Sequence, residues 1–283
     1  MEKLAGYNRK QNTIKKKVTI EGIGLHSGKH VKMSFNPAPP DSGIVFKRID
    51  LENEPIIQAV VDNVTSTARS TSIGIKGVNI KTIEHLMAAL SAFEIDNILI
   101  EIDNEELPAL DGSAIKYAEV LKEAGVESQE ANKNIIKIKD NLFIKSKNTY
   151  LGVFPADEFK INYLLKYEHP KIGTEYFEYT FDKKSFIEKI MPARTFGFAK
   201  EIEKLKSKGL ALGGSLDNAI LLKEDKVVNK LRFQDEFVRH KVLDLVGDFY
   251  LNGPLIGEII AIRSGHQANH KMNQILKKEI NNF

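Results

Sequence analysis

The stretch EFVRHKVLDLVGDFYL, residues 236–251, decides how the rest of the chain is arranged. Its apolar residues recur at the spacing of an amphipathic helix, so one face is expected to lie in a core. On the opposite side His240, Asp244 and Asp248 are four residues apart and share one stripe, with Gly247 leaving room above His240. Taken alone, a solvated stripe of charge is the commoner interpretation. An imidazole and a carboxylate one turn apart can also bind one Zn²⁺ ion.

Composition and charge exclude several classes of protein. The chain has 283 residues, which suggests two domains of about 150 residues each. Its 41 basic and 38 acidic residues leave a net charge of +3, so we expect no nucleic-acid partner. The chain has no cysteine, which excludes disulfides and thiolate metal sites. Histidine, aspartate and glutamate remain as metal ligands.

The sequence carries no signal for export or membrane insertion. Its lysine-rich start lacks the apolar run of a signal peptide, and no stretch approaches the ~20 apolar residues of a membrane span. We therefore expect a cytoplasmic monomer without integral membrane contact.

Residues 1–128 are predicted to form a first domain. Thr82 is expected to be the N-cap of its first helix. β-Branched runs and helical periodicity predict strands at 18–20, 31–35, 44–46, 55–64 and 73–75, a helix at 82–93, a strand at 97–102 and a helix at 114–124.

A polar segment without apolar periodicity, 127–134, is predicted to separate the domains. Residues 134–283 are predicted to form the second domain. Its expected elements are strands at 135–144, 150–154, 159–165 and 176–181, a helix at 183–190, a β-α-β insert at 193–222, the helix at 236–251, a strand at 255–262 and a helix from 268.

Both halves end with the same order of elements: a helix carrying a histidine, a strand, a polar turn and a second helix. We infer a weak internal duplication. Strand-rich runs followed by helices predict an α+β fold of two similar halves, each with helices layered on a mostly antiparallel sheet. If the halves pack as a sandwich, the histidine-bearing helices meet at their interface, where the active site is expected.

His85 can supply a third metal ligand to a site begun by His240 and Asp244. Two histidines, one carboxylate and an open position for water form the ligand set of a catalytic zinc. Such a zinc lowers the pKa of its water to ~7 and polarises a carbonyl, which suits hydrolysis of an amide or ester.

Three further residues complete a hydrolytic site. Glu84 is placed to take the proton of the water, and His266 could protonate the leaving group. Asp248 could keep that imidazole charged. Alone, a Glu-His pair at a helix start is most often a surface feature that suits the helix dipole.

Seven motifs carry a family resemblance. They are GIGLHSG at 22–28, KTIEHL at 81–86, LPALDGSA at 107–114, ARTFGF at 193–198, GGSLDNA at 213–219, EFVRHKVLDLVGD at 236–248 and SGH at 264–266. In residues and order they resemble the zinc-dependent UDP-3-O-acyl-N-acetylglucosamine deacetylases of lipid A biosynthesis. Because the motifs span nearly the whole chain, the match is specific.

The resemblance implies the same roles for the residues already named: zinc ligands His85, His240 and Asp244, general base Glu84, and acid His266 supported by Asp248. It further implies that Thr195 donates a hydrogen bond to the developing oxyanion and that Lys241 contacts substrate near the metal. As ordinary structural residues, Thr195 would be part of a strand and Lys241 a solvated partner of nearby acids. Zinc is the expected cofactor, and Fe²⁺ is left open as the metal used in the cell.

The family fold has one insert per half, which implies a first insert near 58–77 and a second near 193–222. The second insert lines a passage for the acyl chain of the substrate in the family. Apolar residues suited to this passage are Phe196, Ile202, Leu205, Leu210 and Leu212, although packing against the sheet explains them as well.

The resemblance implies an enzyme that removes the N-acetyl group of UDP-3-O-acyl-N-acetylglucosamine, giving the free amine and acetate early in lipid A biosynthesis. Its partner is then a small-molecule UDP-sugar with an acyl chain. Two alternatives stay open: a zinc amidase for another acylated sugar, and a phosphate-binding module with a structural metal. A structural zinc would have four protein ligands and no open position.

Overall fold

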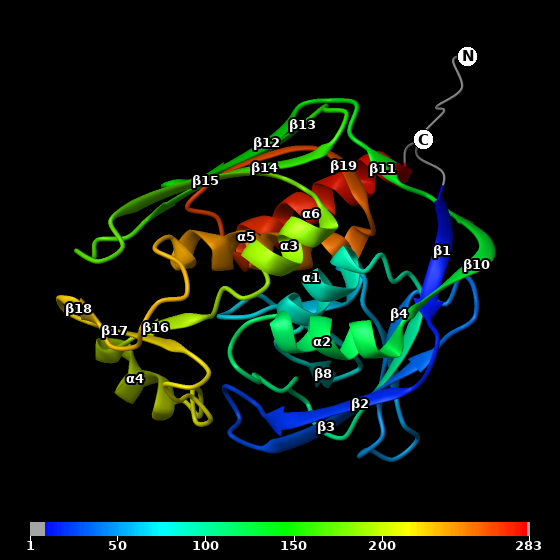
Figure 1. Cartoon of the computed structure of the whole chain (residues 1–283), viewed down its shortest axis with the longest axis horizontal. Coiled ribbons are helices and arrows are strands. Elements are labelled where there is room, and N and C mark those ends of the chain that lie inside the picture. The colour runs from blue at the N-terminus through cyan, green and yellow to red at the C-terminus, as the bar shows by residue number, and fades with distance from the viewer. Residues whose placement is uncertain (1–8, 282–283) are drawn as a thin grey trace.

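A computed structural model describes residues 9–281 and shows two sheets with helices layered between them (Figure 1). The strand order of the first sheet is β2 (Val18–Ile23), β3 (His30–Pro37), β9 (Ile98–Ile102), β4 (Ile44–Arg48) and β5 (Ile56–Gln58). The order of the second is β12 (Leu142–Ser146), β13 (Thr149–Phe154), β19 (Leu255–Ile262), β14 (Phe159–Lys166) and β15 (Thr174–Thr180), and β11 (Ile136–Lys137) also pairs with β19.

In both five-strand paths the third and fourth strands are parallel and the other neighbours are antiparallel. The helices between the sheets are α1 (Glu84–Ala92), α2 (Ile115–Ala124), α3 (Lys183–Lys189), α5 (Glu236–Phe249) and α6 (His266–Asn281). The predicted α+β class with mostly antiparallel sheets is confirmed. The internal duplication and the domain limits, 1–128 and 134–283, stay predictions.

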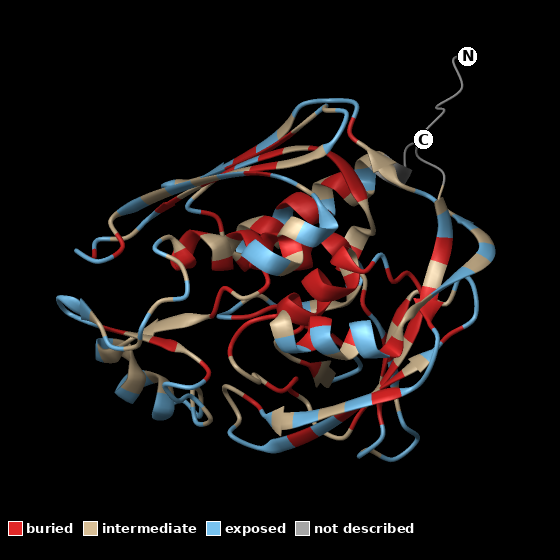
Figure 2. Cartoon of the chain, in the orientation of Figure 1, coloured by how far each residue is buried: buried red, intermediate tan, exposed pale blue. Residues whose placement is uncertain are grey.

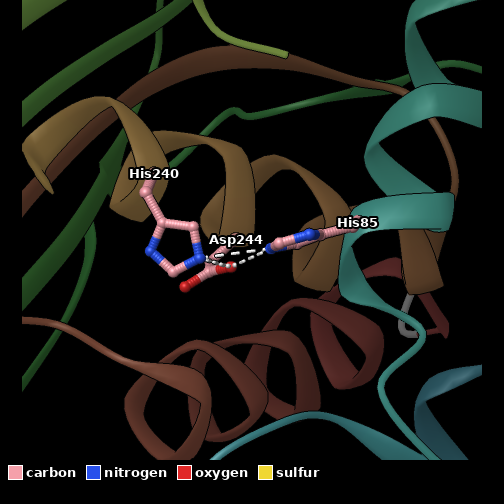
Figure 3. Close-up of side chains that lie close together, drawn as sticks. All are labelled: His85, His240 and Asp244. Carbon is pink, nitrogen blue, oxygen red and sulfur yellow. Dashed lines mark hydrogen bonds and ion pairs between the residues drawn. The ribbon is translucent and has the colours of Figure 1, made fainter. Parts of the chain in front are cut away.

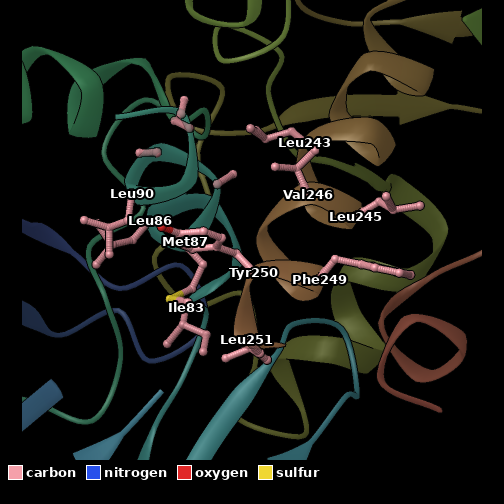
Figure 4. Packing of buried hydrophobic residues seen from close by; sticks show 14 of the residues in the cluster. Ile83, Leu86, Met87, Leu90, Leu243, Leu245, Val246, Phe249, Tyr250 and Leu251 are labelled. Carbon is pink, nitrogen blue, oxygen red and sulfur yellow. The ribbon is translucent and has the colours of Figure 1, made fainter. Parts of the chain in front are cut away.

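The core that positions the site lies between α1 and α5, whose residues are buried along most of their length (Figure 2). Apolar side chains of both helices belong to one buried cluster, in which Leu243 and Val246 of α5 point towards α1 and Phe249 points away from it (Figure 4). Gly247 permits the close approach, since a Cβ there would lie 1.9 Å from the carbonyl oxygen of Glu84. The absence of a side chain at Gly247 therefore lets α1 pack closely against α5. It does not leave the space above His240 that the sequence had suggested.

Two small sheets extend from these layers. One consists of β6 (Val64–Ser66), β7 (Ser72–Ile75) and β8 (Val78–Ile80), and is preceded by the 3-10 helix η1 (Val61–Asn63). The other consists of β16 (Phe196–Phe198), β17 (Ile220–Lys223) and β18 (Lys226–Val227), with α4 (Ala199–Lys206) between the parallel strands β16 and β17. A second 3-10 helix, η2 (Tyr250–Asn252), follows α5.

Several local elements differ from the sequence prediction. The strand predicted at 55–64 is the short strand β5 followed by η1, and the strand predicted at 135–144 is two strands, β11 and β12. The polar segment 127–134, whose role as a domain boundary stays a prediction, is largely a strand, β10 (Val126–Lys133), which pairs antiparallel with β1 (Arg9–Ile14). Its residues alternate only between exposed and half-buried positions, so an apolar period was absent. Thr82 is not the N-cap of α1, which is Ile83; Thr82 has φ 63°.

Within residues 9–281 no helix combines the length and the apolar character needed to cross a membrane.

A half-buried glutamate beside the start of α5, Glu175, should make the free energy of unfolding depend on pH. Glu175 on β15 accepts a hydrogen bond from the Val238 N–H at 2.9 Å, and burial, with a smaller contribution from Asp235, raises the pKa of Glu175 to about 7. The folded state therefore favours the protonated acid, and this contribution to stability is complete below pH ~4.5 and lost as the pH rises through about 7.

We expect Glu175→Gln, which keeps the acceptor and cannot ionise, to be more stable than the wild type by about 1–2 kcal/mol at pH 8 and equal to it near pH 4.5. This range of 1–2 kcal/mol is smaller than the full pKa shift would give, because the side chain is partly exposed and water screens its charge. Urea unfolding at both pH values measures the difference. Glu178→Gln, an exposed position on the same strand, is the control. A difference that does not change with pH would contradict the assignment.

Candidate active site

Three predicted metal ligands converge between α1 and α5 (Figure 3). His85 comes from the first turn of α1, while His240 and Asp244 lie one turn apart on α5. The Nε2 atoms of the two histidines are 3.2 Å apart, and Asp244 Oδ1 lies 3.3 Å from the first and 3.4 Å from the second. All three residues are buried.

The chemistry of these donors fits a divalent metal ion. Asp244 Oδ1 is buried without a hydrogen-bond partner among the described residues. Burial lowers the pKa of His240 well below its usual value, which leaves a neutral ring with a free lone pair. Burial works against ionisation of Asp244, but the positive charge of the Lys241 ammonium beside it holds the pKa of its carboxyl well below the usual range. Two imidazole nitrogens and one carboxylate oxygen that face one another are suited to bind a cation.

A carboxylate and an imidazole lie directly beside these donors. Ligand atoms of Glu84, Asp244 and His266 all lie within 4.8 Å of one another. Glu84 accepts a hydrogen bond from the Thr71 N–H at 2.9 Å, and burial raises the pKa of its carboxyl. A carboxylate with a raised pKa is a stronger proton acceptor.

His266, the first residue of α6, is held by Asp248. Its Nδ1 lies 2.9 Å from Asp248 Oδ2, and its Nε2 lies 3.9 Å from Asp244 Oδ2. Burial alone would lower the pKa of this imidazole, but the charge and hydrogen bond of Asp248 raise it to about 9. The ring is therefore charged near neutral pH, with its Nε2–H facing the site.

Sequence reasoning missed three residues around Asp248. Thr71 Oγ1 donates to Asp248 Oδ1 at 2.5 Å, Asn269 Nδ2 donates to Oδ2 at 2.8 Å, and Asn273 Nδ2 donates to the backbone carbonyl at 2.6 Å. Asn269 and Asn273 follow His266 at three and seven residues on α6, so helical spacing was a usable signal. Thr71 had no such signal beyond a hydroxyl-rich segment.

Lys241 contacts the site, and Thr195 precedes Phe196, whose ring centroid lies 5.6 Å from that of His240. Lys241 Nζ donates to Asp244 Oδ2 at 2.7 Å and lies 5.7 Å from the ring centroid of Phe196, so Lys241 is no solvated surface lysine. Thr195 is held through its backbone, which donates to Gly112 and accepts from Ile220, both at 2.8 Å. The catalytic roles of Lys241 and Thr195 stay predictions.

A largely apolar cavity of about 290 Å³ is lined by Thr195 and by residues of β16, α4 and β17. Of the predicted passage residues, Phe196, Ile202 and Leu205 line it, whereas Leu210 and Leu212 do not. Leu212 is 52% exposed, and its backbone N–H donates to the His26 carbonyl. The remaining walls of the cavity include Leu25, Leu216 and Leu221.

An α+β fold with a buried His-His-Asp set beside a carboxylate and a charged imidazole defines a metal-dependent hydrolase. The chain belongs to the UDP-3-O-acyl N-acetylglycosamine deacetylase family, whose sequence model matches residues 11–278. This confirms the family expected from the motifs.

Similar proteins cover nearly the whole chain. A protein from a Nitratiruptor species is 44% identical over 277 residues, which are 97% of this chain and 92% of that protein. One from Nautilia profundicola is 46% identical over 273 residues, 96% of this chain and 91% of that protein. Both carry the name UDP-3-O-acyl-N-acetylglucosamine deacetylase.

Proposed function

We propose that this enzyme hydrolyses the N-acetyl group of UDP-3-O-acyl-N-acetylglucosamine, releasing acetate and the free amine in lipid A biosynthesis. The observation that carries the proposal is the convergence of His85 Nε2, His240 Nε2 and Asp244 Oδ1 beside the buried carboxylate of Glu84. Family membership over residues 11–278 supports the choice of substrate.

We propose Zn²⁺ as the ion held by His85, His240 and Asp244, with Fe²⁺ as the alternative in the cell. Two imidazole nitrogens and one carboxylate oxygen, without thiolates, suit either ion. When bound, zinc supplies a Lewis acid that polarises the amide carbonyl and makes water a better nucleophile near neutral pH.

The residues of the chain move the protons in this proposal. As water adds to the carbonyl carbon, its proton passes to the carboxylate of Glu84. As the C–N bond breaks, the Nε2–H of His266 passes to the amine, while Asp248 keeps the ring oriented through Nδ1. Thr195 and Lys241 are assigned to the developing oxyanion and to the substrate near the metal.

The cavity lined by Phe196, Ile202 and Leu205 is proposed to bind the acyl chain, since its walls are mostly apolar and include Thr195. A small-molecule UDP-sugar is then the substrate. A cytoplasmic location and a monomeric state belong to the same proposal.

Removal of metal tests the proposal. Protein incubated with UDP-3-O-acyl-N-acetylglucosamine should release one acetate per free amine, and dialysis against a chelator should abolish release until zinc is added back. Acetate is measured enzymatically, and metal content by mass spectrometry. Undiminished acetate release by metal-free protein would contradict the metal site. Hydrolysis of other acylated sugars with none of the UDP-sugar would favour the rival amidase. Salt-sensitive phosphate binding without hydrolysis would favour the binding module.

A further inference from the structure

Three of the sequence motifs, at 22–28, 107–114 and 213–219, meet beside the apolar cavity and take no part in the proposed proton transfers. Residues 24–28 of the first half contact residues 211–213 of the loop that closes the cavity. The N–H of Leu212 donates to the His26 carbonyl and that of Gly213 to the Leu25 carbonyl, both at 3.1 Å. A Cβ at Gly213 would lie 2.2 Å from the Gly24 carbonyl oxygen, so the two backbones meet without a side chain between them.

The other end of this closing loop is held by residues 107–114. A Cβ at Gly112 would lie 2.0 Å from the carbonyl oxygen of Asn218, and Gly112 has φ 80°. The Asn218 amide in turn donates to the Gly213 carbonyl at 2.9 Å and accepts from the Ser215 N–H at 2.8 Å. The loop 211–219 is thus fixed at both ends by the first half of the chain.

A buried carboxylate, Glu106, holds the first of these contacts in place. Glu106 is 1% exposed. Its Oε1 accepts the His26 N–H and its Oε2 accepts the Ser27 N–H, each at 2.7 Å. Hydrogen bonds of this length to an ionised acceptor are among the stronger ones in proteins. A Cβ at Gly24 would lie 2.5 Å from Oε2, so the loop wraps closely around the carboxylate.

We propose that Glu106 is a positioning residue that sets the preference of the enzyme for acylated substrate. Its carboxylate fixes residues 24–28, these fix residues 211–213, and Leu25, His26 and Ala211 form part of the cavity wall. A displaced wall leaves gaps around an apolar chain and so weakens its binding. This inference rests on the proposed function.

The test is Glu106→Gln, which keeps the shape but turns an NH₂ group towards one of two N–H donors. The measured quantity is the ratio of kcat/KM for UDP-3-O-acyl-N-acetylglucosamine to that for UDP-N-acetylglucosamine, which has the acetamido group but no acyl chain. We expect this ratio to fall about tenfold, the scale of one lost charge-assisted hydrogen bond. Glu105→Gln is the matched control, because the side chain of this half-exposed neighbour pairs with Lys81 on the surface.

Hydrogen exchange at the Leu212 and Gly213 amides gives a second readout that needs no substrate. Exchange should be faster in Glu106→Gln than in Glu105→Gln or the wild type, at equal zinc content. If the wild type hydrolyses neither sugar, the proposed function fails, and exchange alone decides whether Glu106 holds the loop. An unchanged ratio, or equal losses on both sugars, overturns the assignment of Glu106 to acyl preference. Unchanged exchange overturns the positioning role.

Discussion

Glu84→Gln should lower kcat for acetate release by about 10²–10⁴-fold while the protein keeps its metal. The amide is nearly isosteric and can still accept the Thr71 N–H, but it cannot take a proton from water. The Glu84 carboxylate is buried beside Asp244 and His266 and accepts one backbone hydrogen bond, which leaves the other oxygen for the reacting water. Single-turnover rates and metal content measure the two expectations separately.

A carboxylate just beyond α1 supplies the control. Glu94→Gln removes a charge from an exposed side chain that pairs with Arg9 and follows the C-terminal end of α1, whereas Glu84 is at its N-terminal end. It should leave kcat within about twofold. If Glu84→Gln retains wild-type kcat with full zinc, another group takes the proton, and the assignment of the general base is wrong.

The sequence was sufficient to predict which side chains on one helix point in the same direction. His240, Asp244 and Asp248 share a stripe because four-residue spacing fixes their directions, and the structure places all three in the interior. Their burial could not be read from the helix alone, because a charged stripe is buried only when another element supplies partners. For His240 and Asp244 that element is α1, for which the family motif at 81–86 was the signal, and for Asp248 it is chiefly α6.

Contacts between segments that are far apart in the sequence could not be predicted from residue spacing. The Thr71 hydroxyl reaches Asp248 across 177 residues of chain, and no spacing rule connects them. The side-chain directions of Leu210 and Leu212 could not be read for a related reason, since a loop has no period that assigns its side chains to a wall. The Leu210 N–H donates to the Leu205 carbonyl and the Leu212 N–H to the His26 carbonyl, and neither contact has a signal in the sequence.

The two carboxylates of the stripe on α5 are predicted to have different functions, and mutation should distinguish them: Asp244 binds the metal, and Asp248 orients His266. Asp244→Ala should cost more than about 100-fold in metal affinity, since loss of a group that merely orients a ligand already costs about 10–100-fold. Asp244 Oδ1 lies 3.3–3.4 Å from both histidine Nε2 atoms, and its Oδ2 pairs with Lys241. Without the carboxylate that ammonium lies unpaired beside two imidazoles and repels any cation. Acetate release should fall with metal content.

Asp248→Ala should instead retain the metal and lose about 10²-fold in kcat with little change in KM. Asp248 contacts His266, Thr71 and Asn269 and none of the three proposed ligands' donor atoms, so the metal set stays intact. Metal content after dialysis, together with kcat and KM, separates this outcome from general loss of structure, which would reduce metal content as well. Equal metal loss in the Asp244 and Asp248 variants would mean that the stripe acts as one unit. Because Asp248 orients His266 through Nδ1, a kcat loss at full metal content identifies proton delivery as the step that this carboxylate supports.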